Sequence, residues 1–336
     1  GSLFAEHHAL GIALSSRDAV HNEKNIFLRN FTVHNTRPET RTIKLFLSQQ
    51  FRIFESRRGD TGFFDPRVNA IIHYKGDTTI LVNAMSGTRS FDEFNIGLFG
   101  IEGKEGTYLD ANDGVLEQNP IEHGSVDSVL GLTFTVPGKA SNDAYYWVVC
   151  GDSIPEVHTL DEHVLHEGPD RLITSTDAFW KAWLDKEETD LAPLPSQLQT
   201  LYRRSLMIMR VHADNRGGII ASSDTDMLHH GRDTYSYVWP RDAAVIAHTF
   251  DRTGYRDASR RFFEYMAERL DPSGYLMHKY RTDGMLGSSW HPWIIHGEPR
   301  LPIQEDETAT VIYMLWEHYE HYHDIEFIES MYNRFI

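Results

Sequence analysis

The first half of the chain follows the period-2 pattern of β-strands. Short runs rich in β-branched and aromatic residues alternate apolar and polar positions, and turn-forming clusters such as residues 59–62 (GDTG) separate them. The predicted strands cover residues 26–35, 42–48, 70–74, 79–84, 130–136 and 144–150. Many strands, short turns and few helices predict an antiparallel β-sandwich in which one face of a sheet meets solvent.

The pattern changes to the period of helices near residue 175. Residues 175–186 place bulky apolar side chains on one helical face, and Ser175 or Thr176 is the expected N-cap. Residues 191–195 contain two prolines, which suits the end of a linker, and residues 196–199 (SQLQ) match the capping box that opens a helix. Two further apolar stripes predict helices within residues 258–270 and 308–322.

These periods predict two domains joined by a linker. A β-sandwich domain is expected over residues 1–170, a linker with one helix over residues 171–195, and an α-helical domain over residues 196–336. Two long aromatic loops, residues 221–240 and 271–304, connect the predicted helices. Long ordered loops between packed helices are where binding residues usually lie, so a binding site is expected in these two loops.

Composition excludes several classes of protein. The net charge of −17 argues against a nucleic-acid partner, because phosphates would be repelled, and is compatible with a neutral substrate such as a sugar. No apolar run approaches the roughly 18–20 residues that a membrane helix needs. The single cysteine, Cys150, excludes an internal disulfide framework, so a cytoplasmic location is the default expectation. No phosphate-binding Lys-Ser/Thr follows Gly217-Gly218, and no cofactor is predicted.

The densest group of chemically active residues is the segment 233–242, DTYSYVWPRD, just before an apolar helical run. Asp242 can accept two hydroxyl hydrogens in charge-assisted bonds, while Arg241 donates from a rigid fork. Trp239 and the neighbouring tyrosines offer flat apolar faces for a pyranose ring. An equally simple interpretation is that Asp242 favours the helix N-terminus and pairs with Arg241.

Several ordered motifs resemble family 15 of the glycoside hydrolases, which includes glucoamylases, glucodextranases and some trehalases. The first is Tyr-Val-Trp-Pro-Arg-Asp at 237–242, preceded by GGIIAS at 217–222. The second is GSSWHPW at 287–293, followed by LPIQEDETA at 301–309. The segments GDT at 59–61 and NAIIHYKGD at 69–77 are similar to the sandwich that precedes the barrel in prokaryotic members.

The resemblance implies a fold and a set of substrate-binding residues. The fold is an incomplete, supersandwich-like β-sandwich followed by the first half of an (α/α)6 barrel, in which the chain reaches the fifth of twelve helices. Arg241 and Asp242 would bind the outer hydroxyls of a terminal glucose, and Tyr235 and Trp239 would line its subsite. Further binding residues are expected at Trp290, which together with Trp293 would line the next subsite or pack the loop, and at Gln304.

An inverting glycosidase needs two carboxyl groups about 6.5–9.5 Å apart. Glu305 and Glu307 are the candidates in this chain, but residues two apart on a helix do not face each other. The resemblance places the general acid in a Trp-Glu-Glu segment that does not occur here, so both catalytic carboxylates are expected beyond Ile336. Residues 1–336 alone are therefore expected to be inactive and to need the rest of the barrel, as a continuous or a second chain.

No metal site is predicted. His318, His321 and His323 match no strong zinc spacing and are interpreted as a solvated helix end. Asp224 and Asp226 are expected to form turns, and His229-His230 has no nucleophile beside it in sequence. Cys150 is expected to be a small buried hydrophobe.

Three functions remain in competition. The first is an exo-acting, inverting α-glucoside hydrolase that releases glucose from the non-reducing ends of α-glucans or oligosaccharides, with trehalose as another substrate. The second is a disaccharide phosphorylase of related architecture, which would need inorganic phosphate. The third is a non-catalytic carbohydrate-binding fragment, which would bind maltose or trehalose without hydrolysing it.

Overall fold

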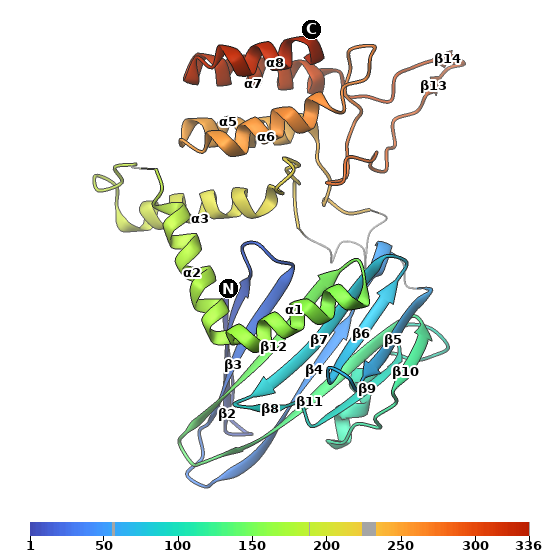
Figure 1. Ribbon diagram of the computed structural model, residues 1–336, viewed down its shortest axis with the longest axis vertical. Coiled ribbons are helices and arrows are strands. Elements are labelled where there is room, and N and C mark those ends of the chain that lie inside the picture. The colour runs from blue at the N-terminus through green and yellow to red at the C-terminus, as the bar shows by residue number, and fades with distance from the viewer. Residues whose placement is uncertain (56–57, 188, 224–232, 336) are drawn as a thin grey trace. The chain divides into compact units, whose positions relative to one another are not determined.

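The structure, a computed structural model, describes residues 1–55, 58–187, 189–223 and 233–335. It divides into two compact units, residues 1–181 and residues 182–336 (Figure 1). The candidate residues Asp224, Asp226, His229 and His230 lie outside the described residues.

The first unit is built from two antiparallel sheets. The larger sheet runs in the order β1-β2-β3-β12-β7-β6-β5-β10 with β8 paired to β7, and the smaller sheet runs β4-β11-β9. The strands are β1 Ser2–His7, β2 Ile12–Val20, β3 Ile26–Asn35, β4 Arg41–Gln50, β5 Asp60–Asp65, β6 Ala70–Lys75, β7 Thr78–Ser86, β8 Arg89–Ser90, β9 Glu93–Leu98, β10 Ile121–Gly124, β11 Val126–Val136 and β12 Ser141–Gly151, with 3-10 turns at Ile53–Glu55 and Thr107–Asp113. All six predicted strands are present, and the predicted antiparallel sandwich is confirmed.

The core between the two sheets is apolar and follows the strand period. Along β7, Ile80, Val82 and Ala84 face this core, while Leu81 faces the opposite side of the larger sheet. That opposite side is covered near its centre by α1, Ile154–Glu167, so the sheet has no fully solvated face there. The prediction of one wet face was therefore wrong for the central strands.

A buried polar contact attaches α1 to the sheet. Trp147 Nε1 donates to Asp161 Oδ1 at 2.7 Å, and Asn83 Nδ2 donates to the same oxygen at 3.2 Å. Burial raises the pKa of Asp161, and the two hydrogen bonds oppose that shift. The contact satisfies the indole donor of the largest fully buried side chain in the unit.

The predicted caps of two helices were wrong. Helix α2, Pro169–Leu184, begins before Ser175 and Thr176, whose hydroxyls donate back to the Leu172 carbonyl within the helix. Helix α3, Ser196–His212, has Pro195 at its N-cap position and no side-chain cap. Serine and threonine can bond inside a helix as well as cap it, so their presence in the sequence does not by itself mark a helix start.

The second unit consists of helices joined by long loops. Its helices are α3, α5 Pro240–Arg252, α6 Arg256–Ala267, α7 Glu305–Tyr322 and α8 Ile325–Phe335, with a small hairpin of β13 Ile294–Ile295 and β14 Glu298–Pro299. Helix α5 packs against both α6 and α7 around a core rich in aromatic side chains. The helices that were predicted within residues 258–270 and 308–322 are α6 and α7.

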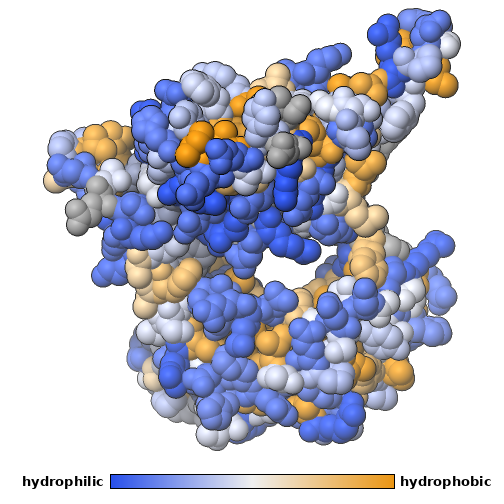
Figure 2. Space-filling view, turned by 45° about the horizontal axis from the view of Figure 1, so that its top comes forward, coloured by the Kyte–Doolittle hydropathy of each residue, from blue (hydrophilic) through white to orange (hydrophobic). Residues whose placement is uncertain are grey.

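Hydrophilic residues dominate the face of the molecule drawn in Figure 2, and hydrophobic residues interrupt it in patches. Among the described residues, no helix is long and apolar enough to cross a membrane.

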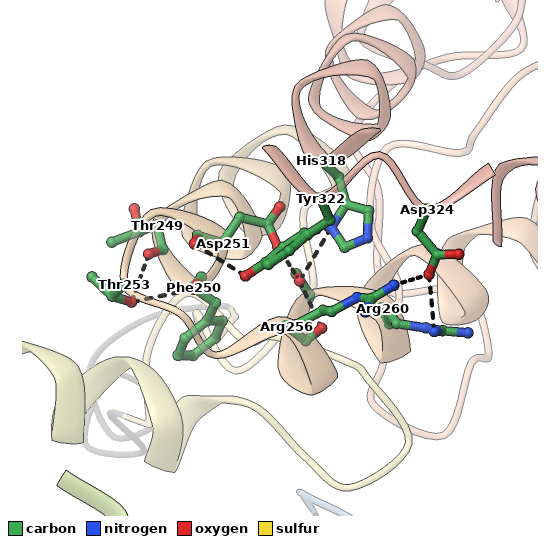
Figure 3. Close-up of polar contacts among 10 residues, drawn as sticks. Thr249, Phe250, Asp251, Thr253, Arg256, Arg260, His318, Tyr322 and Asp324 are labelled. Carbon is green, nitrogen blue, oxygen red and sulfur yellow. Dashed lines mark hydrogen bonds and ion pairs between the residues drawn. The ribbon is translucent and has the colours of Figure 1, made fainter. Parts of the chain in front are cut away.

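A buried polar network joins α5, α6 and α7 (Figure 3). His318 Nδ1 lies 2.9 Å from Asp251 Oδ1, and Ser259 Oγ donates to the same carboxylate oxygen. All three side chains are buried, so the prediction of a solvated histidine cluster was wrong for His318, although His321 and His323 are exposed. The described part of the chain contains no group of three His, Cys, Asp or Glu residues that could hold a metal ion.

Candidate functional site

The site begins where α5 and α7 start side by side. Trp239 occupies the N-cap position of α5, Pro240 is its first residue, and Asp242 lies in its first turn. Proline at this position is favoured, because its missing N–H would have no partner in a helix start. Backbone hydrogen bonds of 2.7 and 2.9 Å between Val238 and Tyr280 hold this entry loop against the next loop.

Arg241 links the first turns of the two helices. Its Nη1 donates to both carboxylate oxygens of Asp306 on α7, at 3.1 and 3.0 Å. Its Nη2 lies 3.6 Å from Asp242 Oδ2, which is an ion pair but longer than a hydrogen bond. The Asp242 side chain is 53% exposed, so its carboxylate can still accept hydrogen bonds from hydroxyl groups. The arrangement is consistent with both sugar binding and the favourable charge at a helix start.

The ring of Trp239 contacts those of Tyr235 and Tyr237, and these three rings, in the residues just before Arg241, are called the aromatic wall. The rings of Tyr235 and Trp239 lie 5.5 Å apart and are inclined by 32°, and Tyr237 meets Trp239 edge to face at 6.0 Å. Trp239 is buried, whereas Tyr235 is 51% exposed and Trp290 is 66% exposed. The exposed faces available to a ligand therefore belong mainly to Tyr235 and Trp290, with Trp239 as the buried support between their loops.

A neutral histidine, which the sequence did not single out, connects these rings. Trp239 Nε1 donates to His278 Nε2 at 3.2 Å, so the neutral ring carries its proton on Nδ1, which donates to Ser289 Oγ at 3.1 Å. Burial, assisted by the nearby His291, Lys279 and Arg241, lowers the pKa of His278 to about 4. The ring of Trp290 lies 4.3 Å from the His278 ring, which ties Trp290 to the wall.

The start of α7 contributes carboxyl groups in two different environments. Glu305 is exposed, whereas Glu307 is fully buried, and neither Glu307 oxygen has a hydrogen-bond partner among the described residues. Burial raises the pKa of Glu307 to about 8, opposed by Arg241 and assisted by Asp242 and Asp306. The buried Oε1 of Gln304 also has no partner in the described part of the chain. The two glutamates lie on different faces of the helix, as their spacing predicts.

A second residue that sequence reasoning missed is Lys279. Its ammonium is buried beside the aromatic wall and donates to Asp233 Oδ2 at 2.8 Å. Burial alone would raise the pKa of Asp233, but hydrogen bonds from Lys279 and Ser288 outweigh it and hold that pKa below its usual value. The only signal in the sequence is a lysine inside an aromatic and apolar run, YLMHKY at 275–280.

Comparison with known proteins gives a family match within the second unit. Residues 196–331 match the model of glycosyl hydrolases family 15. The match covers both α5 and α7, so Arg241, Asp242 and the acidic start of α7 all lie within it. The resemblance that the motifs indicated is thereby confirmed.

Solved structures extend the likeness to both units. The chain is similar to a bacterial glucoamylase in complex with acarbose, with a TM-score of 0.75 and 17% identity over 95% of this chain and 45% of that one. It is also similar to a protein from the human microbiome assigned as a kojibiose phosphorylase, with a TM-score of 0.55 and 11% identity over 94% of this chain and 40% of that one. No curated protein matches. The predicted fold, a β-sandwich followed by part of an (α/α) barrel, is confirmed, and the chain spans less than half of these structures.

Proposed function

We propose that this chain is part of an inverting, exo-acting α-glucoside hydrolase, and that the site at the start of α5 holds a terminal glucose. The main observation behind this proposal is the pair Arg241–Asp242. Asp306 binds the Arg241 guanidinium, while the Asp242 carboxylate stays half exposed. A charged acceptor beside a charged donor suits the vicinal hydroxyls of a sugar. Tyr235 and Trp290 expose the apolar ring faces that a pyranose needs, Trp239 supports them from its buried position, and Gln304 supports the site from the start of α7.

The general acid and base belong, in this proposal, to the part of the barrel that this chain does not cover. Glu305 and Glu307 are separated by a single residue in one helical turn and cannot flank a glycosidic bond with room for a water molecule. The glucoamylase that resembles this chain is more than twice as long as the matched region. Residues 1–336 alone are therefore expected to bind sugar without measurable turnover, and robust turnover by this chain would contradict the proposal.

The role of Asp242 is tested by Asp242→Asn in the complete enzyme. The change removes a charged hydrogen-bond acceptor and should cost about 2–4 kcal/mol of transition-state binding, measured as a fall in kcat/KM. Asp257→Asn is the matched control, because Asp257 is an exposed aspartate in the first turn of α6. A lowered melting temperature with unchanged kcat/KM would show that Asp242 only stabilises the helix start.

The structural likeness to a phosphorylase keeps that second activity open. A phosphorylase replaces the activated water with inorganic phosphate, so it needs no general base. Sugar release by the complete enzyme, measured with and without inorganic phosphate, separates the two: release without phosphate supports the hydrolase, and strict dependence on phosphate supports the phosphorylase.

A further inference from the structure

Lys279 places a positive charge inside the protein next to the candidate glucoside site. Its side chain is 1% exposed, and it is among the largest fully buried side chains of the chain. Lysine is almost never fully buried unless it is paired, because its ammonium loses hydration. The groups around the Lys279 ammonium must therefore compensate for its lost hydration.

Three aromatic rings and one carboxylate surround the ammonium. Nζ lies 4.2 Å from the ring centre of Tyr237, 5.0 Å from that of Trp239 and 5.3 Å from that of Trp290. It donates to Asp233 Oδ2 at 2.8 Å. Ring faces attract cations at these distances, and the attraction strengthens when the cation is desolvated.

The same residue connects the two loops from which the site is built. Ser288 Oγ donates to the Asp233 carboxylate at 2.5 Å, so Asp233 joins Lys279 to the loop that carries Trp290. The backbone N–H of Gly287 donates to the Lys279 carbonyl at 3.0 Å. Lys279 itself lies in the loop before α7. Its side chain contacts the loop before α5 at Asp233, Tyr237 and Trp239, while its backbone bonds to Gly287 within its own loop.

We propose that Lys279 is a positioning residue of the candidate glucoside site, whose buried ammonium fixes the rings of Trp239 and Trp290 at the distance that the bound sugar requires. The inference rests on the proposed function, because the rings matter only if a sugar packs against them. Lys279 is not placed in contact with the sugar. It acts through the two tryptophans, through Tyr237 and through Asp233.

The test is Lys279→Met in the 336-residue chain. The change removes the ammonium, keeps a flexible side chain of similar length, and leaves behind Asp233, whose side chain is 38% exposed and can be hydrated. Acarbose affinity, measured by isothermal titration calorimetry, is expected to fall roughly tenfold while the melting temperature stays close to the wild-type value. Lys279→Arg keeps the positive charge and is expected to recover part of the affinity.

Lys44→Met is the matched control for loss of a paired lysine. Lys44 Nζ donates to Glu93 Oε1 at 2.7 Å in the first unit and touches none of the site residues. Its removal is expected to leave acarbose affinity unchanged. Near-ultraviolet circular dichroism without ligand gives a second readout, because it reports the surroundings of tryptophan rings and should change in Lys279→Met but not in Lys44→Met.

Two failures are distinguishable. If the wild-type chain binds acarbose and folded Lys279→Met binds it equally well with an unchanged near-ultraviolet spectrum, the role of Lys279 is overturned and the proposed function stands. If the wild-type chain binds no acarbose, the proposed function and the sugar-positioning role fail together, whatever the spectrum shows. If Lys279→Met does not fold, Ser288→Ala replaces it, because that change removes one hydrogen bond to the Asp233 carboxylate without leaving a buried charge unpaired. Unchanged acarbose affinity of the Ser288→Ala variant overturns the proposal.

Discussion

At the residue scale, the most unusual group of the site is the carboxyl of Glu307. It is fully buried and unpartnered among the described residues, and burial raises its pKa from 4.5 to about 8. Between those two values the folded protein holds a proton that the unfolded chain releases. The contribution of Glu307 to stability therefore falls as the pH rises from about 5 to about 8.

Glu307→Gln should remove this dependence, because an amide of similar shape does not titrate. The fall in melting temperature between pH 5 and pH 8 is expected to be smaller in the variant than in the wild-type protein. Glu305→Gln, two residues earlier on the exposed side of the same helical turn, serves as the control and should leave the wild-type profile unchanged. Parallel profiles for Glu307→Gln and the wild-type protein would mean that Glu307 is ionised across this range.

Some residues of the candidate site were visible in the sequence and others were not, for a physical reason. Arg241, Asp242 and Trp239 are adjacent in the chain, so their local motif was visible. Lys279 acts through Asp233, which lies 46 residues away along the chain. That partnership exists only after two loops are paired, and residue spacing alone gives no sign of it.

At the element scale, the second unit depends on polar contacts as well as apolar packing. The Asp251 carboxylate on α5 receives Ser259 from α6 and His318 from α7, and Tyr322 donates to the Asp251 carbonyl at 3.1 Å (Figure 3). The second Asp251 oxygen and His318 Nε2 are buried without a hydrogen-bond partner in the described residues. A buried group that loses its remaining partner is costly, so this network should respond strongly to mutation.

His318→Ala should destabilise the helical unit by about 2–4 kcal/mol, because it opens a cavity and removes a partner of a buried carboxylate. The free energy of unfolding in urea measures the effect. His321→Ala is the matched control, since His321 is exposed on the same helix, and it should change stability by less than about 0.5 kcal/mol. Equal effects of the two variants would show that the network contributes little.

Helix prediction succeeded where apolar periodicity was strong and failed at α1. The start of α1 has the capping-box sequence from Ser153 to Glu156: the Ser153 side chain accepts from Glu156 N at 3.4 Å, and the Glu156 carboxylate accepts from the N–H of Asp152, the residue before the N-cap, at 2.7 Å. The serine and glutamate of this pattern are visible in the sequence, but strands precede them, so residues 154–167 were predicted to belong to the β-sandwich domain. The central strands of the larger sheet are consequently more buried than a two-layer sandwich predicts.

At the scale of the whole molecule, helix α3 carries an exposed apolar face. Leu201 and Ile208, seven residues apart, are 58% and 50% exposed and belong to one stripe with Leu198 and Val211. Neighbouring exposed apolar side chains on one face mark a contact surface. We propose that the remaining helices of the barrel cover this face in the complete enzyme.

Leu201→Lys combined with Ile208→Lys should make the 336-residue chain less prone to associate. Both side chains are at least half exposed, so the free energy of unfolding should change by less than about 1 kcal/mol, while binding of a hydrophobic fluorescent dye and concentration-dependent association both decrease. Val115→Lys is the control, because Val115 is an exposed apolar residue of the first unit outside this face. If the double variant binds dye and associates like the wild-type chain, the α3 face is an ordinary solvated surface. A loss of both properties would agree with a face that other helices of the barrel normally cover.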